Sequence, residues 1–148
     1  MDAAGLKTAG DTDPVRFLQM CFPPTGWIAL FLKNYQNGHV AQCIGPLPWA
    51  TSDHVQAWLR EMNDRRFNVY CSVNEVVPGR RVRTRNAIGA IRDIFLDADA
   101  DGPDVLARIA DRRDLPPPSC VLTSSHGRFH IFWRVNGFEV TQVERLQR

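Results

Sequence analysis

The chain lacks any run of apolar residues long enough to cross a membrane, since a transmembrane helix needs about 20 of them in succession. Its first residues, Met1–Gly5, lack the charged and apolar regions of a secretory signal peptide. It also has no internal repeat and no low-complexity tract. With 44% apolar and 23% charged residues among 148, the composition is typical of one globular domain. We therefore expect a soluble, cytoplasmic protein with no membrane partner.

Cysteine is scarce, and its spacing argues against a zinc site. The four cysteines are widely scattered and form no CxxC pair, which is the usual start of a structural zinc site. Buried free thiols are the expected state of Cys21, Cys43, Cys71 and Cys120. Residues 1–12 are small and polar, and we expect them to be disordered.

An excess of charge is also missing, because the net charge of +2 is too small to indicate nucleic-acid binding by itself. One segment, Gly79–Arg85, is nevertheless strongly basic and contains no acid. Two interpretations stay open: a solvated loop, or a basic ridge for template or triphosphate phosphates. The residues that would form the ridge are Arg80, Arg81, Arg83 and Arg85.

The most informative segment that is present is Ile94–Asp99, a short apolar run ending in two aspartates. Side chains alternate across a strand, so Asp97 and Asp99 would share one face with Cα atoms roughly 6 to 7 Å apart. Two converging carboxylates suit a hard divalent cation, which often shares its oxygen ligands with phosphate. The alternative is that both aspartates simply begin an acidic loop that continues to Gly102.

A second informative segment lies thirty residues downstream, after the helix-breaking run Pro116–Pro118. A strand at 119–123, turn chemistry at Ser124–Gly127 and a strand at about 128–135 predict a hairpin. In the second strand an apolar face alternates with a face that carries Arg128, His130, Phe132 and Arg134. An arginine side chain and an imidazole on one face are suited to binding nucleotide phosphates.

These residues resemble the catalytic domain of the archaeo-eukaryotic primase superfamily, and most closely its RepB-like branch from plasmid and phage replication proteins. The hDhD motif of that superfamily is matched by Leu96–Asp99. The branch pattern TSPGRYHxYW is matched by Thr123–Trp133, with one extra residue in the turn. The preceding prolines and the strand at Asn68–Asn74 are also similar, so the resemblance covers roughly residues 68–137.

The resemblance implies a DNA primase-polymerase that performs metal-dependent, template-directed nucleotidyl transfer. Asp97 and Asp99 would bind Mg²⁺ or Mn²⁺, and two such ions would stabilise the attacking and leaving oxygens. His130 would contact the incoming nucleoside triphosphate, helped by Arg128 and Ser125. The expected partners are a single-stranded DNA template and nucleoside triphosphates; a helicase domain or protein is left open.

One departure from the family concerns its third acidic residue, which belongs to an hD motif on a later strand. Nothing after His130 matches that motif, because Glu139 and Glu144 fall in a segment expected to be helical. Thr141–Glu144 has the capping-box pattern that begins a helix. Since only about two turns follow, we expect an N-terminal fragment of a longer protein that catalyses little by itself.

The order of elements predicts an α/β (α+β) fold with an RRM-like mixed, mostly antiparallel sheet flanked by helices. Residues 13–148 are expected to form one primase-like catalytic domain. The expected elements are a helix at 14–20, a helix capped by Ser52 or Asp53 that carries Val55, Trp58, Leu59 and Met62 on one face, and a helix at about 103–112. The expected strands are at 27–32, 40–43 and 67–73, with another that ends at 98, followed by the hairpin at 119–135; Pro46–Pro48 is expected to be a connector.

Two other function classes remain open. A metal-dependent nuclease or rolling-circle replication endonuclease would also use acids and histidines on a sheet. That class usually pairs two histidines around one apolar residue, whereas His130–Phe132 supplies one. A non-catalytic RRM-like nucleic-acid binder would keep the fold without the chemistry.

Overall fold

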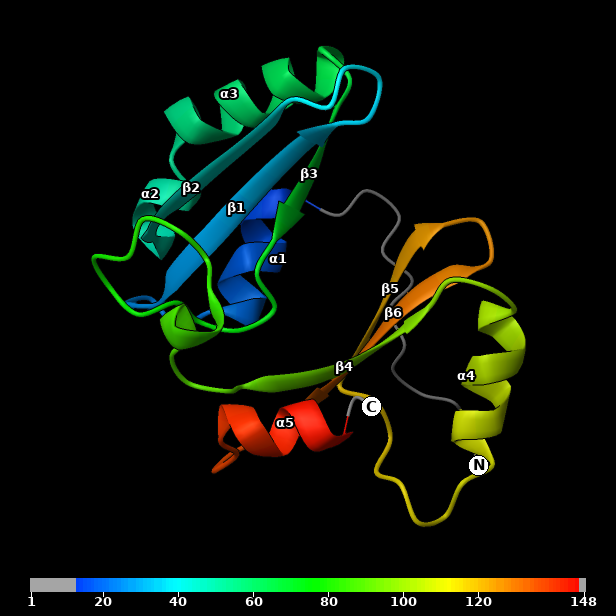
Figure 1. Ribbon diagram of the computed structural model, residues 1–148. Coiled ribbons are helices and arrows are strands. Elements are labelled where there is room, and N and C mark those ends of the chain that lie inside the picture. Colours follow the sequence, from blue (N-terminus) through cyan, green and yellow to red (C-terminus); the bar gives the residue numbers. More distant parts are fainter. Residues whose placement is uncertain (1–12, 147–148) are drawn as a thin grey trace. The chain divides into compact units, whose positions relative to one another are not determined.

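The computed structural model describes residues 13–146, which divide into two compact units with their boundary between Ala90 and Ile91 (Figure 1). Each unit is described by itself. The expected disorder of residues 1–12 lies outside the described residues. No helix between residues 13 and 146 is both long enough and apolar enough to span a bilayer.

The N-terminal unit contains a three-stranded antiparallel sheet in the order β2–β1–β3. Its elements are α1 (Pro14–Cys21), β1 (Trp27–Asn34), β2 (Val40–Pro46), α2 (Leu47–Ala50), α3 (Asp53–Asp64), β3 (Phe67–Cys71) and the 3₁₀ helix η1 (Arg85–Ala87). Alternate residues of β1, namely Ile28, Leu30 and Leu32, are almost fully buried. They pack with Leu18 and Met62 from α1 and α3, so the helices cover this face of the sheet.

Helices α1 and α3 begin where the sequence predicts. Asp13 accepts a hydrogen bond from the Val15 amide, and Ser52 accepts one from the Val55 amide at 3.4 Å. The connector predicted at Pro46–Pro48 is wrong, because Leu47–Ala50 forms the short helix α2. Proline is compatible with a first helical turn, where the backbone N–H has no partner within the helix.

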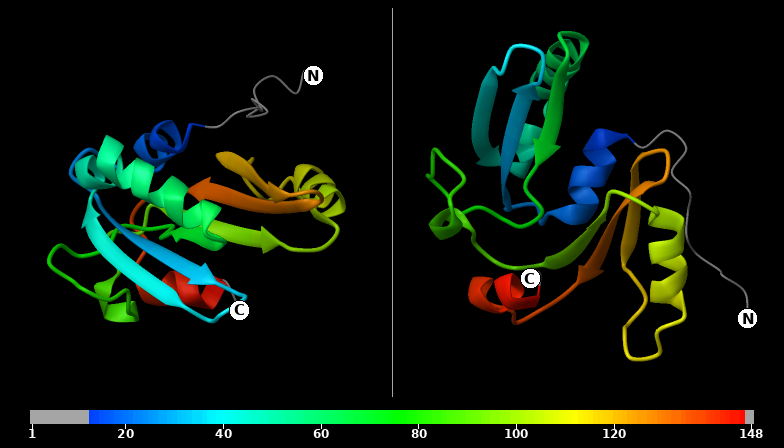
Figure 2. Two further views of the ribbon diagram at one scale, coloured as in Figure 1. Left: turned by 90° about the horizontal axis from the view of Figure 1, so that it is seen from above. Right: turned by 45° about the vertical axis from the view of Figure 1, so that its right-hand side comes forward.

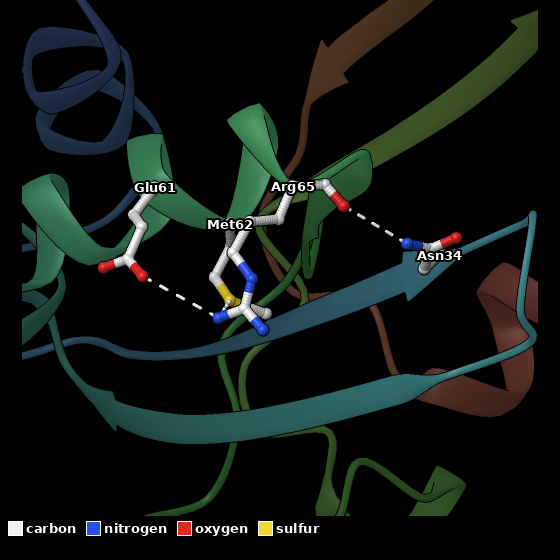
Figure 3. A network of polar contacts seen from close by, with 4 residues as sticks. All are labelled: Asn34, Glu61, Met62 and Arg65. Carbon is white, nitrogen blue, oxygen red and sulfur yellow. Dashed lines mark hydrogen bonds and ion pairs between the residues drawn. The ribbon is translucent and has the colours of Figure 1, made fainter.

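The buried side chain of Asn34 joins two turns of the N-terminal unit, and Figure 3 shows its contact with the Arg65 backbone. Its Oδ1 accepts hydrogen bonds from the amides of Gln36 and Asn37, which shapes the turn between β1 and β2. Its Nδ2 donates to the Arg65 carbonyl at 3.2 Å, in the turn between α3 and β3. The Arg65 Nη1 also lies 3.7 Å from Glu61 Oε1, in an exposed ion pair with the last turn of α3.

The C-terminal unit contains a second antiparallel sheet, in the order β4–β6–β5 (Figure 2). Its elements are β4 (Asp93–Ala98), α4 (Gly102–Ala110), β5 (Cys120–Ser125), β6 (Arg128–Arg134) and α5 (Val140–Leu146). On one face, Ile131 in the central strand is completely buried, with Leu96 and Val121 beside it in the register. The Trp133 indole donates to the Pro116 carbonyl at 2.9 Å, which ties the proline-rich segment to β6.

The hairpin between β5 and β6 differs in detail from the prediction. β5 continues to Ser125, so the tight turn consists of His126 and Gly127, and the predicted four-residue turn is too long. The register shifts between Thr123 and Ser125, which is the mark of a β-bulge. The extra residue seen in the sequence is therefore absorbed in the strand. Gly127 has a φ of 73°, a conformation that favours glycine.

The two helices of this unit begin slightly earlier than predicted. Helix α4 begins at Gly102, whose amide donates to the Gly127 carbonyl at 3.1 Å and so fastens the helix to the hairpin. Helix α5 begins at Val140, so the capping box at Thr141 is wrong. Instead the Gln142 side chain accepts a hydrogen bond from the Glu139 amide, which is the reach-back half of a capping box that starts two residues earlier.

The predicted fold class is confirmed as a mixed α/β protein with antiparallel sheets flanked by helices. The strands form two separate three-stranded sheets, and both are antiparallel throughout.

Candidate nucleotide and metal site

The candidate site begins at the end of β4, where successive side chains point to opposite faces of the sheet and Asp97 lies on the face away from the core. Ala98 is 5% exposed on the apolar face, whereas the Asp97 side chain on the opposite face is 44% exposed. Asp99 follows directly after the last strand residue and is exposed. The strand therefore presents Asp97 to solvent and leads the chain outward into Asp99.

His130 lies directly beside Asp97, because the two residues are register partners in β6 and β4. The His130 Nε2 is 3.2 Å from Asp97 Oδ1, which fits a hydrogen bond donated by the imidazole. The His130 side chain is 36% exposed. The acid and the imidazole therefore share one face of the sheet and remain accessible to a ligand.

Two further predicted residues stand on the same face. Arg128 precedes His130 by two positions in β6, and Ser125 is the register partner of Arg128 in β5. Both are exposed. The register thus gathers Ser125, Arg128, His130 and Asp97 along one rim of the sheet, at the end where the β5–β6 turn lies.

Arg134 belongs to the same alternating series but has a structural partner. Its Nε donates to Asp93 Oδ1 at 2.9 Å, and the Asp93 side chain is 8% exposed. This pair lies at the far end of β4 and β6 from Asp97. We therefore assign Arg134 a structural role in pairing with Asp93, and Arg128 is the remaining candidate for a phosphate-binding cation.

Aromatic rings separate the accessible rim from that ion pair. Phe95 and Phe132 have ring centroids 6.3 Å apart, and the His130 ring meets Phe132 edge-on at 6.4 Å. Packing against Phe132 limits the orientations of the imidazole. Next to Phe132, burial raises the pKa of the Cys120 thiol and the Asp93 charge adds to this effect, so Cys120 is not an activated nucleophile.

The chemistry of the donor set fits a magnesium or manganese ion bound together with phosphate. Mg²⁺ commonly takes one or two carboxylates and completes its shell with water and substrate phosphates. Asp97 and Asp99 supply two carboxylates of this kind. Within residues 13–146, no three His, Cys, Asp or Glu side chains are grouped closely enough to hold an ion by themselves.

Sequence reasoning missed the backbone at Asp101, between the two aspartates and α4. Asp101 has a φ of 53°, in the left-handed region, which aspartate enters more readily than most non-glycine residues. A positive φ also occurs away from the candidate site, at Arg66 in the turn between α3 and β3, where φ is 68°. The Asp101–Gly102 pair indicated a turn, but no local signal shows which of the two residues takes the positive φ.

The basic segment Gly79–Arg85, called the arginine segment below, belongs to the N-terminal unit. Asp97 belongs to the other compact unit. Its four arginines are exposed. Both ends of the segment are held: the Val77 amide donates to the Ala87 carbonyl at 2.8 Å, and Val76 and Ile88 form a β-bridge.

Comparison with known proteins places the chain in a family. A family model described as the RepB DNA-primase N-terminal domain matches residues 41–148. No curated protein matches the chain. The crystal structure of the primase RepB′ resembles it with 13% sequence identity and a TM-score of 0.49, over 81% of this chain and 36% of that one. The chain thus spans about a third of the length of that solved protein. Since the family model covers well over half of the sequence, the resemblance seen in its motifs is confirmed: the chain belongs to the RepB DNA-primase N-terminal domain family.

Proposed function

We propose that this chain is the nucleotide-binding module of a DNA primase-polymerase, acting in the replication of a plasmid, phage or other mobile element. The observation that carries the proposal is the pairing of Asp97 with His130 on an accessible face of the β4–β6–β5 sheet. Membership of a DNA-primase domain family supports the same conclusion. The proposed substrates are nucleoside triphosphates and a single-stranded DNA template.

In this proposal the polar rim receives the triphosphate. Because Asp97 accepts from Nε2 of His130, the doubly protonated imidazole is the form that donates to a phosphate oxygen, through Nδ1. The Arg128 guanidinium and the Ser125 hydroxyl are the other donors to phosphate oxygens. Asp97 holds the imidazole in orientation through its hydrogen bond. In the reaction, a 3′-hydroxyl loses its proton to water and its oxygen bonds to the α-phosphorus. The bond from the α-phosphorus to the oxygen that bridges to the β-phosphate breaks, and pyrophosphate leaves with that oxygen.

Asp97 and Asp99 are the residues proposed to hold Mg²⁺ or Mn²⁺. When bound, such an ion neutralises phosphate charge and acts as a Lewis acid on phosphate oxygens. The two carboxylates also repel a triphosphate that arrives without its cation. We therefore expect nucleotide binding by this chain to require the divalent ion.

Nucleotide binding provides the sharpest test, because it needs no template and no further domain. Titration calorimetry with a nonhydrolysable nucleoside triphosphate should give measurable binding in Mn²⁺ and little in EDTA. Asp97→Asn should weaken binding at least tenfold, because it removes one anionic ligand. His130→Gln and Arg128→Gln should each weaken it by several-fold through lost charge-assisted hydrogen bonds.

Asp104→Asn is the matched control, since Asp104 is an exposed acid of the same unit in the first turn of α4. It should bind nucleotide like the unchanged chain. Equal affinity of the Asp97 and Asp104 variants would contradict the proposed site. Metal-dependent cleavage of single-stranded DNA that Asp97→Asn abolishes would favour a nuclease, and DNA binding without any nucleotide binding would favour a non-catalytic module.

A further inference from the structure

The N-terminal unit carries an accessible aromatic cluster on the sheet face opposite its helices. Phe31 in β1 and Tyr70 in β3 are register partners, with ring centroids 6.2 Å apart. The Tyr35 hydroxyl lies 3.2 Å from the Tyr70 hydroxyl. Tyr35 and Tyr70 are 62% and 40% exposed, although tyrosine rings usually bury most of their area. We call Phe31, Tyr35 and Tyr70 the aromatic face.

The polar groups around these rings hold them in place and give the face a positive charge. The Asn68 amide donates to the Tyr70 hydroxyl at 3.3 Å, and the Lys33 ammonium lies 4.3 Å from the centre of the Tyr35 ring. Consistent with this network, the hydrogen bond between the hydroxyls raises the pKa of Tyr35 and lowers that of Tyr70. Among the residues of β1, β2 and β3, which are all described, none is acidic.

The arginine segment is anchored on the same side of this sheet. Ala29 and Ile44 alternate with the helix-facing residues of β1 and β2, and Val76 and Ala87 pack on them. Phe31 follows Ala29 by two positions in β1, so it shares this face. Val76 and Ala87 flank the loop with Arg80, Arg81, Arg83 and Arg85. The rings and the two residues that anchor the arginine loop therefore lie on one side of one sheet.

We propose that the aromatic face is a binding site for the unpaired bases of single-stranded DNA, with Lys33 and the arginine segment attracting the phosphates. Aromatic side chains on a sheet stack on bases of any sequence, and nearby cations follow the backbone. A duplex hides its base faces inside the stack, so the site favours single strands. This proposal rests on the proposed function, because the proposed function identifies the bound nucleic acid as the single-stranded DNA template.

The test measures binding of a fluorescent oligothymidine to the whole chain by anisotropy, in EDTA and without nucleotide. Tyr70→Leu and Tyr35→Leu should each weaken binding about tenfold, the loss expected for one stacked base. Tyr70→Phe should stay within about twofold, because it keeps the ring. Arg81→Gln with Arg83→Gln should weaken binding and flatten its dependence on salt.

Phe138→Leu is the matched control, because Phe138 is also an exposed aromatic residue but belongs to the other unit. It should bind like the unchanged chain. Circular dichroism and thermal midpoints establish that each variant is folded. Unchanged affinity in both tyrosine-to-leucine variants would overturn the proposal, as would equal affinity for duplex and single-stranded DNA. Loss of self-association in place of DNA binding would also overturn it, because the face would then be a protein interface.

The outcome separates this site from the proposed nucleotide site. If the leucine variants keep metal-dependent nucleotide binding but lose the oligonucleotide, the aromatic face is supported independently of Asp97. If nucleotide binding fails in the unchanged chain while ring-dependent DNA binding remains, the primase proposal fails and the aromatic face stands.

Discussion

Asn34 illustrates how much one buried polar residue contributes to this fold. Three hydrogen bonds join its side-chain amide to the backbone, two in the β1–β2 turn and one in the α3–β3 turn. Each of the groups it pairs is a backbone amide or carbonyl at a partly buried position, where the Asn34 side chain supplies the partner. Because these turns also position Tyr35 and β3, Asn34 supports the geometry of the aromatic face.

We predict that Asn34→Ala lowers the free energy of unfolding by about 2–3 kcal/mol, because each lost hydrogen bond of this kind contributes about 1 kcal/mol. Asn34→Asp should also destabilise, since it removes the donor to Arg65 and buries a charge. Urea unfolding followed by circular dichroism measures both effects. Asn63→Ala, an exposed position in α3, should change stability by less than about 0.5 kcal/mol. Equal midpoints for the two alanine variants would contradict the role of Asn34.

At the scale of elements, the contact between α4 and the β5–β6 turn is set by a single glycine. A Cβ atom on Gly102 would lie 2.5 Å from the Gly127 carbonyl oxygen and 2.9 Å from the Phe129 ring. The absence of a side chain therefore lets the helix start against the hairpin. The same contact fixes the loop from Asp99 to Asp101, which connects the candidate site to α4.

We predict that Gly102→Ala destabilises the chain by about 1–3 kcal/mol through overpacking and shifts the start of α4. Gly137→Ala is the control, because Gly137 has a φ of 74° but no atom within 4 Å of the point that a Cβ would occupy. That variant should lose about 1 kcal/mol through backbone conformation alone. Nucleotide affinity should fall in Gly102→Ala and stay unchanged in Gly137→Ala. If both variants keep full affinity, the α4 contact does not support the site.

The sequence predicts most elements here but not how they pair. Alternating residues and flanking prolines or glycines predict β4, β6 and the hairpin, because these signals are local. Helix α2 escapes prediction since its four residues include a proline, and the predicted start of α5 is wrong because two overlapping capping patterns compete. The contact of Asp97 with His130 depends on the register between strands more than thirty residues apart, which no local pattern fixes.

At the scale of the whole molecule, the two units differ in the size of their cores. Most of the buried apolar residues belong to the N-terminal unit, where Ile28, Leu30 and Leu32 lie in its central strand. In the C-terminal unit, Ile131 holds the equivalent central position with fewer buried neighbours. Segments with less buried apolar area open at lower free energy, and ligand sites are often found in them.

We predict that hydrogen exchange is slower at the Leu30 amide than at the Ile131 amide, although both lie in central strands.

Adding Mn²⁺ with a nonhydrolysable nucleoside triphosphate should slow hydrogen exchange in β4 and β6. At a ligand concentration of a hundred times Kd, the free energy of the opening that permits exchange should rise by up to about 2.7 kcal/mol. Exchange in β1 should change less. Mass spectrometry or NMR measures both effects. If the ligand protected β1 and β6 equally from hydrogen exchange, a site confined to the C-terminal unit would be contradicted.

The bulge at Ser124 has a consequence for how relatives of this protein diverge. An added residue in an ordinary strand would reverse the facing of every residue after it, but here the strand returns to register by Ser125. We therefore expect relatives to tolerate one residue more or fewer in β5 without a change in the position of His130 in β6. The spacing from Gly127 to His130 has no such tolerance, so natural variation should accumulate before the turn and be rare after it.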